Sequence, residues 1–190
     1  MLGYKIDNFD TSSKGNIQYV SQGALVDRLL PMISKNSTMA TLDNQNLRNG
    51  NILENGNESQ ILRRYLIQDN LAMAQIQVIS FFNAWLSFLE HRDFENTIMF
   101  KTVGFIAGLN IYKKIYKEVE NNEEVLGTSF YDISDRDIFE YNSNVELTIN
   151  KLQNSYYRKL EEMNIQALEI DKISSSLSGA NYIEKTLLRQ

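Results

Sequence analysis

Residues 59–90 contain neither glycine nor proline, and their apolar side chains recur every three or four positions. This spacing places apolar side chains on one face of a helix, and the segment lacks the two residue types that most often end one. The sequence therefore predicts one long helix, whose apolar stripe contains Leu62, Leu66, Met73, Ile76, Ile79, Phe82, Trp85, Leu86 and Leu89. Phe81 and Phe88 lie off this stripe, so we expect the second half of the helix to be buried on several sides.

A second helix is predicted over residues 94–120, where apolar spacing resumes. Charged residues 91–93 interrupt the apolar run, and Asp93 is a residue type that caps the start of a helix. The two helices then form a hairpin or one bent helix. His91, at the junction, is expected to cap the end of the first helix, with a response to pH as the alternative.

Two glycines, Gly104 and Gly108, stand four residues apart in this second helix. Each costs a helix about 1 kcal/mol relative to alanine, so a packing role is needed to explain them. Small residues at this spacing let two helix backbones approach closely, which is the role we predict. The alternative is a hinge, or a membrane-active hairpin formed by residues 70–112.

The most regular apolar spacing starts at Ser143 and predicts a third helix over residues 143–178. Its spacing of threes and fours is typical of a coiled-coil-like seam, formed by Val145, Ile149, Leu152, Tyr156, Leu160, Met163, Ala167, Ile170 and Leu177. At 1.5 Å per residue this helix would be about 54 Å long, more than the diameter of a small domain. It needs an equally long partner, either the 59–90 helix or a second copy of the chain.

Residues 1–58 are polar and rich in turn-forming residues, and they predict an extended N-terminal arm. One short helix is expected between Ser21 and Pro31. Because the arm has no apolar core of its own, we expect it to be disordered or to dock on a neighbouring subunit. The predicted fold is all-α, with this arm followed by a helical domain over residues 59–190.

Composition excludes several kinds of chemistry, because the 190 residues include no cysteine and one histidine. Disulfides, thiolate nucleophiles, zinc ribbons, iron–sulfur clusters and two-histidine metal sites are thereby excluded. The formal net charge of −5 disfavours binding to nucleic acid. No phosphate-binding loop, dinucleotide motif or catalytic triad pattern is present. We therefore predict no catalytic residue, no cofactor and no metal, and do not expect an enzyme.

Two clusters of charged side chains are candidate ligand sites. The acidic cluster offers the oxygen ligands that calcium or magnesium takes but lacks EF-hand spacing, so a solvated loop is favoured for Asp132, Asp135, Asp137 and Glu140. The basic cluster could bind single-stranded nucleic acid, but glutamates follow it at once. A core face bordered by solvated lysines is favoured for Tyr112, Lys113, Lys114, Tyr116 and Lys117.

Three features of the sequence favour contacts with neighbouring chains. They are the polar arm, the length of the helices and the wide apolar face of the 59–90 helix. We expect a non-catalytic structural subunit that forms a homo-oligomer or joins other protein subunits in a large assembly. Virion connector, ring or tail proteins and secretion-filament subunits share this layout. The analogy concerns the general class of protein and implies no common function. The predicted interface residues are Phe81, Trp85, Phe88, Gly104, Gly108, Ile149, Leu152, Tyr156, Leu160, Met163 and Ile170. For Trp85 and the phenylalanines around it, a place in the chain's own core is favoured and a partner interface is the alternative.

Two other functions stay open. A membrane-active protein would insert residues 70–112 as a hairpin and act as a pore former or translocator. A helical adaptor would instead bind a partner helix along the seam of residues 145–177. The first residues lack the basic and apolar regions of a secretory signal, so an assembled particle or the cytoplasm is the expected location.

Overall fold

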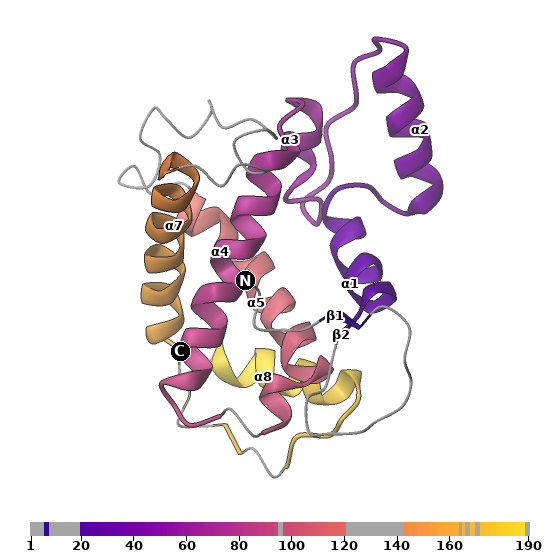
Figure 1. The fold of residues 1–190 in the computed structure, drawn as a ribbon. Coiled ribbons are helices and arrows are strands. Elements are labelled where there is room, and N and C mark those ends of the chain that lie inside the picture. Colours follow the sequence, from indigo (N-terminus) through magenta and orange to yellow (C-terminus); the bar gives the residue numbers. More distant parts are fainter. Residues whose placement is uncertain are drawn as a thin grey trace.

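The computed structural model describes residues 6–7, 20–94, 97–120, 143–163, 165, 168–169 and 172–188. The fold is all-α, as the apolar spacing predicts (Figure 1). Its α-helices are α1 (Gln22–Leu29), α2 (Ser37–Arg48), α3 (Arg63–Ile67), α4 (Leu71–Glu90), α5 (Thr102–Glu120), α7 (Ser143–Glu161) and α8 (Leu177–Leu187). Two short 3-10 helices, η1 (Leu30–Met32) and η2 (Ile98–Phe100), and one parallel pair of two-residue strands, β1 (Ile6–Asp7) and β2 (Val20–Ser21), complete the described elements.

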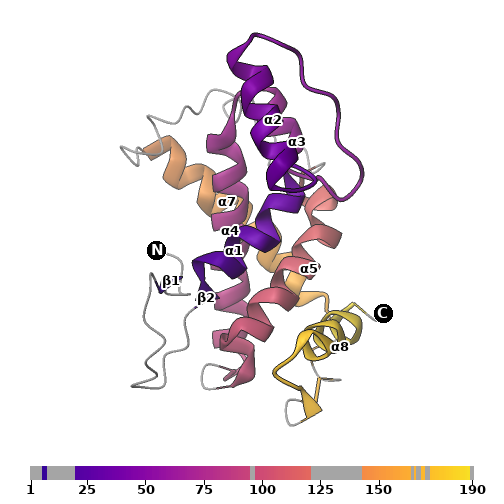
Figure 2. The same ribbon diagram turned by 90° about the vertical axis from the view of Figure 1, so that its right-hand side faces the viewer.

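Helix α4 is the centre of the fold, because most of its side chains are buried. Helix α7 packs along it, and the chain reverses after α4 so that α5 runs back across the same core (Figure 1). Helix α8 packs against α5 at the lower end of the molecule (Figure 2). The predicted helical hairpin is therefore present, and the long partner of the C-terminal seam is α4 of the same chain.

The prediction of one unbroken helix over residues 59–90 is wrong. Helix α3 ends at Ile67, and α4 begins at Leu71. Between them Asp69 has a φ of 52°, and the side chain of Asn70 accepts a hydrogen bond of 3.2 Å from the backbone N–H of Met73. Aspartate and asparagine tolerate the left-handed conformation and cap helix starts, so this break needs neither glycine nor proline.

The predicted cap at Asp93 is also wrong. Asp93 has a φ of 58° and ends the turn after α4, where the backbone N–H of Phe94 bonds the carbonyl oxygen of Leu89. The second long helix starts later than predicted, at Thr102, after η2. His91 is the residue at the C-terminal cap of α4, as predicted, and its Nδ1 lies 2.7 Å from the hydroxyl of Tyr157, within hydrogen-bonding distance.

The predicted helix over residues 143–178 is correct only in its first half. Helix α7 ends at Glu161, and the described residues from 162 to 176 are not α-helical. The length of the partner explains this, because α7 has 19 residues and α4 has 20, so a longer α7 would extend past the end of its partner. The chain turns instead, which buries Leu168 and Ile173 and leads into α8.

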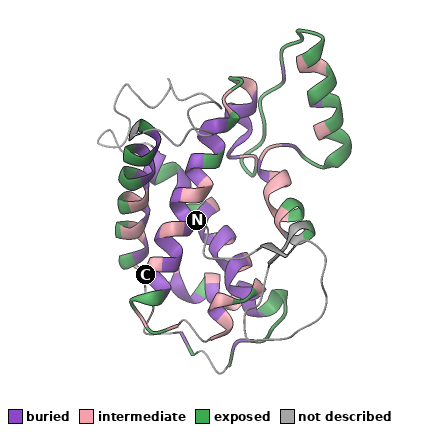
Figure 3. Cartoon of the chain, viewed as in Figure 1, coloured by how far each residue is buried: buried purple, intermediate pink, exposed green. Residues whose placement is uncertain are grey.

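The described part of the N-terminal 58 residues contains two α-helices, α1 and α2, where one helix was predicted. Helix α1 and η1 lie against the core, and Met32 is fully buried there. Residues 33–58, which we call the α2 arm, carry α2 away from the body and return to α3 (Figure 1). Figure 3 shows that α2 is exposed over most of its length, whereas α4 is largely buried.

Candidate functional site

The aromatic residues of α4 that were predicted to form an intermolecular interface lie in the core of their own chain. Phe81, Trp85 and Phe88 are fully buried. The Trp85 ring stacks on both phenylalanines, with centroid distances of 6.5 Å to Phe81 and 5.7 Å to Phe88. In this conformation the three side chains are closed to a second chain.

The two glycines of α5 permit close packing, as predicted. A Cβ atom at Gly104 would collide with the backbone of Met99 in η2, and one at Gly108 would lie 2.9 Å from Nε1 of Trp85. Both contacts are within the chain. The glycine pair therefore fits α5 against η2 and α4.

The seam residues of α7 are also used within the chain. They pack against the core built on α4. Ile149, Leu152, Tyr156 and Leu160 are buried there. Met163 is half-buried beside them, and Ile170 lies outside the described residues. Of the residues predicted to bind other chains, the described ones thus build this chain's own core.

A buried carboxylate lies where α3 meets α5, a feature that the sequence analysis missed. The hydroxyls of Tyr65 and Tyr116 both donate to Oε1 of Glu120, the former over 3.0 Å, and Arg64 forms an ion pair with the same oxygen. Burial raises the pKa of the Tyr116 hydroxyl above its usual value. The spacing of Tyr116 and Glu120, four residues apart on one helix face, is the sequence signal that could have indicated the contact.

A buried amide extends this network to α7. Gln77 of α4 donates to the Tyr65 hydroxyl over 3.3 Å and accepts from the Tyr156 hydroxyl over 2.6 Å. Four helices thereby share one set of hydrogen bonds. The hydroxyl, amide and carboxylate groups of this network bond one another, whereas the buried Nε of Arg64 has no hydrogen-bond partner among the described residues. A pocket of about 370 Å³ beside them is lined by Arg63 and Arg64, which both already form ion pairs.

The α2 arm is held to the body by a buried ion pair. Arg63 of α3 donates two parallel hydrogen bonds to the Asp43 carboxylate, of 2.8 and 3.0 Å, and Ser34 donates a third of 2.5 Å. All three side chains are buried. Hydrogen bonds from Arg63 hold the pKa of the Asp43 carboxyl below its usual value, against the opposing effect of burial.

Arg63 also binds the two backbone segments that enter and leave α2. Its Nε donates to the carbonyl oxygen of Glu54 over 2.8 Å, and its Nη1 donates to that of Ile33 over 3.2 Å. Helix α2 makes at most isolated contacts with the other described helices and strands. The position of the arm therefore depends strongly on this one guanidinium group.

The outer surface of the α2 arm is partly apolar. Met39 and Leu42 of α2 are 39% and 45% exposed, and Ile52 on the returning segment is 94% exposed. From Ser37 to Leu47 the only charged residue is Asp43, whose carboxylate is buried. The exposed face of α2 thus carries no charge over almost its whole length.

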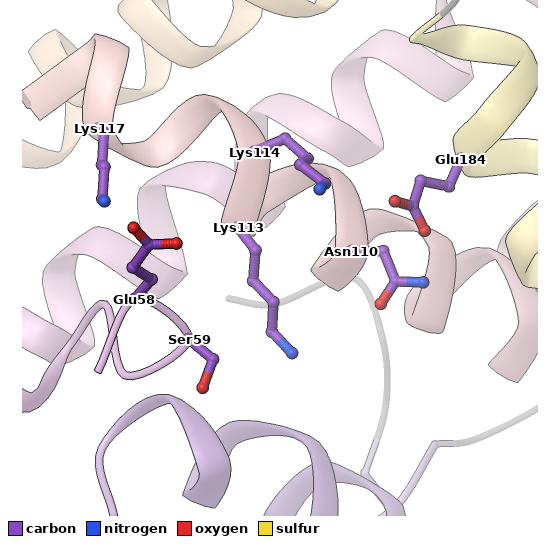
Figure 4. A pocket seen from close by; sticks show the side chains of 7 residues that line it. All are labelled: Glu58, Ser59, Asn110, Lys113, Lys114, Lys117 and Glu184. Atoms are coloured by element: carbon purple, nitrogen blue, oxygen red, sulfur yellow. The ribbon is translucent and has the colours of Figure 1, made fainter. Parts of the chain in front are cut away.

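The basic cluster noted in the sequence lines a pocket of about 400 Å³ (Figure 4). Lys113, Lys114 and Lys117 project from α5, and the loop residues 58–59 and Glu184 of α8 close the sides. The tyrosines next to these lysines in the sequence, Tyr112 and Tyr116, point into the core and are fully buried. This agrees with the predicted core face bordered by lysines, and the pocket itself was not foreseen.

Among the residues that the structure describes, no group of three histidine, aspartate or glutamate side chains could hold a metal ion. The acidic cluster Asp132, Asp135, Asp137 and Glu140 lies outside those residues. Helix α4 is the one described helix that is long and apolar enough to cross a membrane, and most of its apolar stretch is buried inside the fold. Comparisons of the chain with protein-family models, with curated protein sequences and with solved structures gave no match.

Proposed function

We propose that the chain is a non-catalytic assembly subunit whose α2 arm docks on a second copy of the same chain. The observation that carries this proposal is the exposed, uncharged and partly apolar surface of α2, centred on Met39 and Leu42. The core of a protein interface is depleted in charged residues relative to the rest of a protein surface. Since 23% of the whole sequence is charged, an uncharged helix surface of this length stands out.

The arm is also held in place before any partner arrives. Arg63 bonds the segments before and after α2 through the carbonyl oxygens of Ile33 and Glu54. It bonds α2 itself through the carboxylate of Asp43. A segment that is already ordered loses less conformational entropy on binding than a flexible one. The buried ion pair therefore favours a role for the arm in recognition over a role as a loose tail.

The uncharged surface of α2 is compatible with a second copy as the partner. Each chain carries a formal net charge of −5, so two copies repel one another over most orientations. A two-fold contact places the same surface of each copy against itself, which an uncharged surface permits without juxtaposing like charges. The α2 arm is thus a suitable place for two copies to meet.

The test is the native mass of the full chain, measured by light scattering behind size exclusion over a range of concentrations. We expect a discrete multiple of 22.0 kDa for the natural chain. Leu42→Asp should shift the mass to that of the monomer, because it places a charge in the proposed contact. The matched control is Leu147→Asp on α7, where the leucine is 55% exposed, and it should leave the mass unchanged.

Circular dichroism would show that both variants keep their helices. A monomer at every concentration, or equal loss of assembly in both variants, would overturn the proposal. Flotation of the folded protein with lipid vesicles would instead favour the membrane-active alternative, for which α4 has the length. The adaptor alternative would require the seam of α7 to leave α4, since that seam is now buried.

A further inference from the structure

The pocket at α5 brings together three ammonium groups that have no ion-pair partner in the described part of the chain. Lys113, Lys114 and Lys117 come from neighbouring turns of one helix and line the same pocket. In Figure 4 Lys113 and Lys117 project toward the loop of residues 58–59, and Lys114 extends toward the side of Glu184. Elsewhere, Lys159 shows the usual arrangement, with carboxylate oxygens of Glu118 and Glu162 at 3.1 and 3.2 Å. Among the described residues, no carboxylate oxygen lies within 4.0 Å of the amines of the pocket lysines.

Lys113 is the side chain that makes this arrangement unusual. It is half-buried, and its pKa is lowered by that burial and then by the nearby positive charge of Arg28 on α1, with Glu184 acting in the opposite direction. A partly desolvated ammonium group without a bonded partner is unfavourable, and an anion placed beside it would remove the penalty. The position thus favours a negatively charged ligand.

We propose that this pocket binds the phosphoryl group of a small ligand, in a manner independent of the assembly role. Lysine acts on phosphate as a point charge, and the three lysines supply the charge that a doubly negative group requires. Asn110 and Ser59 also line the pocket and can donate hydrogen bonds to phosphoryl oxygens. The volume of about 400 Å³ falls within the range of small-molecule pockets.

Two carboxylates share the pocket with the lysines. In Figure 4 Glu58 lies near the end of Lys117, between Lys117 and Lys113, and Glu184 lies on the side of Lys114. An extended polyanion such as nucleic acid would run past one or both carboxylates, and the whole chain is negative as well. A short anion occupies fewer positions than a polymer and can bind beside Lys113 with less repulsion from these carboxylates.

The experiment is isothermal titration of the full chain with pyrophosphate and with inorganic phosphate, at constant ionic strength. We expect saturable binding, with pyrophosphate the tighter of the two because it carries more charge. Lys113→Gln combined with Lys117→Gln should weaken binding by about tenfold or more. Lys151→Gln, an exposed lysine of α7, is the matched control and should have little effect.

A variant that removes a negative charge from the pocket distinguishes a specific site from a general effect of net charge. Glu58→Gln should tighten pyrophosphate binding severalfold, whereas Glu146→Gln on the exposed face of α7 should not. Circular dichroism would show that each variant is folded. The proposal would be overturned by the absence of saturable binding, or by equal effects of the pocket and α7 variants. Preferential binding of a single-stranded oligonucleotide through the same lysines would also overturn it, in favour of a polymeric ligand.

Discussion

Single residues set how closely the helices of this fold can approach. Gly104 has no room for a side chain, because a Cβ atom there would overlap the backbone of Met99. Gly108 faces the ring of Trp85, which is itself buried between phenylalanines. A backbone and a packed indole ring cannot move aside in the way that the end of a flexible side chain can.

We predict that Gly104→Ala destabilises the protein by about 1–3 kcal/mol, because the overlap outweighs the higher helix propensity of alanine. Gly108→Ala should cost less, since the contact it creates is looser. Gly23→Ala in α1 is the control, because no atom of the described residues would lie within 4 Å of a Cβ atom there. The Gly23→Ala substitution should raise the free energy of unfolding by about 0.5–1 kcal/mol, because alanine has the higher helix propensity. Urea unfolding of the three variants checks the order, and equal stabilities for Gly104→Ala and Gly23→Ala would refute the packing argument.

At the scale of elements, the pairing of α7 with α4 is the main contact of the core. Two residues of α7 offer a direct comparison, because Ile149 is buried against α4 and Leu147 is 55% exposed. Ile149→Asp should cost at least about 3 kcal/mol, since it removes apolar packing and buries an unpaired carboxylate. Leu147→Asp should change stability by no more than about 0.5 kcal/mol. Unfolding curves of the two variants, recorded by circular dichroism, test this difference. Similar unfolding midpoints would mean that the seam of α7 is not part of the core.

The same elements show what apolar spacing could predict. It located the helices around Trp85, Gly108 and Tyr156 because periodic apolar residues must face a core whatever covers them. It missed the break at Asp69 and Asn70, since these residues end helices through backbone conformation and side-chain capping and leave the apolar spacing almost intact. The end of α7 at Glu161 depends on the length of α4, which is a property of the pair.

The candidate sites were harder to predict than the helices. The sequence indicated the lysines of α5 as a group, but the residues that enclose them, Ser59 and Glu184, are far away in the chain. Asp43 and Arg63 are 20 residues apart, and no local pattern links them. Such contacts arise from tertiary packing, which also explains why side chains predicted to bind other chains, Trp85 among them, fill the core of this one.

At the scale of the whole molecule, the chain has two parts that are held by different forces. Apolar packing around Trp85 holds the helical body. The α2 arm has few covered apolar side chains, Ile33 and Leu53 among them, and is held mainly by the ion pair between Asp43 and Arg63. Parts of a protein with different numbers of buried apolar contacts open with different free energies. The arm should therefore detach under conditions that leave the body folded.

Acid is the condition that separates them. The folded-state pKa of Asp43 is lowered, so the stability that its carboxylate gives the arm is complete above the unfolded pKa of about 3.9. That stability is lost as the pH falls through the lower folded pKa. The loss begins below about pH 4 and is complete only below the folded pKa of Asp43. Over this range we expect pepsin to cleave progressively faster within residues 37–58 while the fluorescence of Trp85 still reports a buried indole ring.

Asp43→Asn should produce the same detachment at neutral pH, because an amide cannot neutralise the guanidinium of Arg63, and a neutral-pH protease should then cut the arm. Asn44→Asp, one residue along on the exposed side of α2, should leave the arm resistant. If cleavage of the arm and exposure of Trp85 instead occur at one pH and at one rate, the arm and the body unfold as a single cooperative unit. Stepwise loss, with the arm first, would mean that one buried carboxylate controls whether the proposed contact surface of α2 is presented at all.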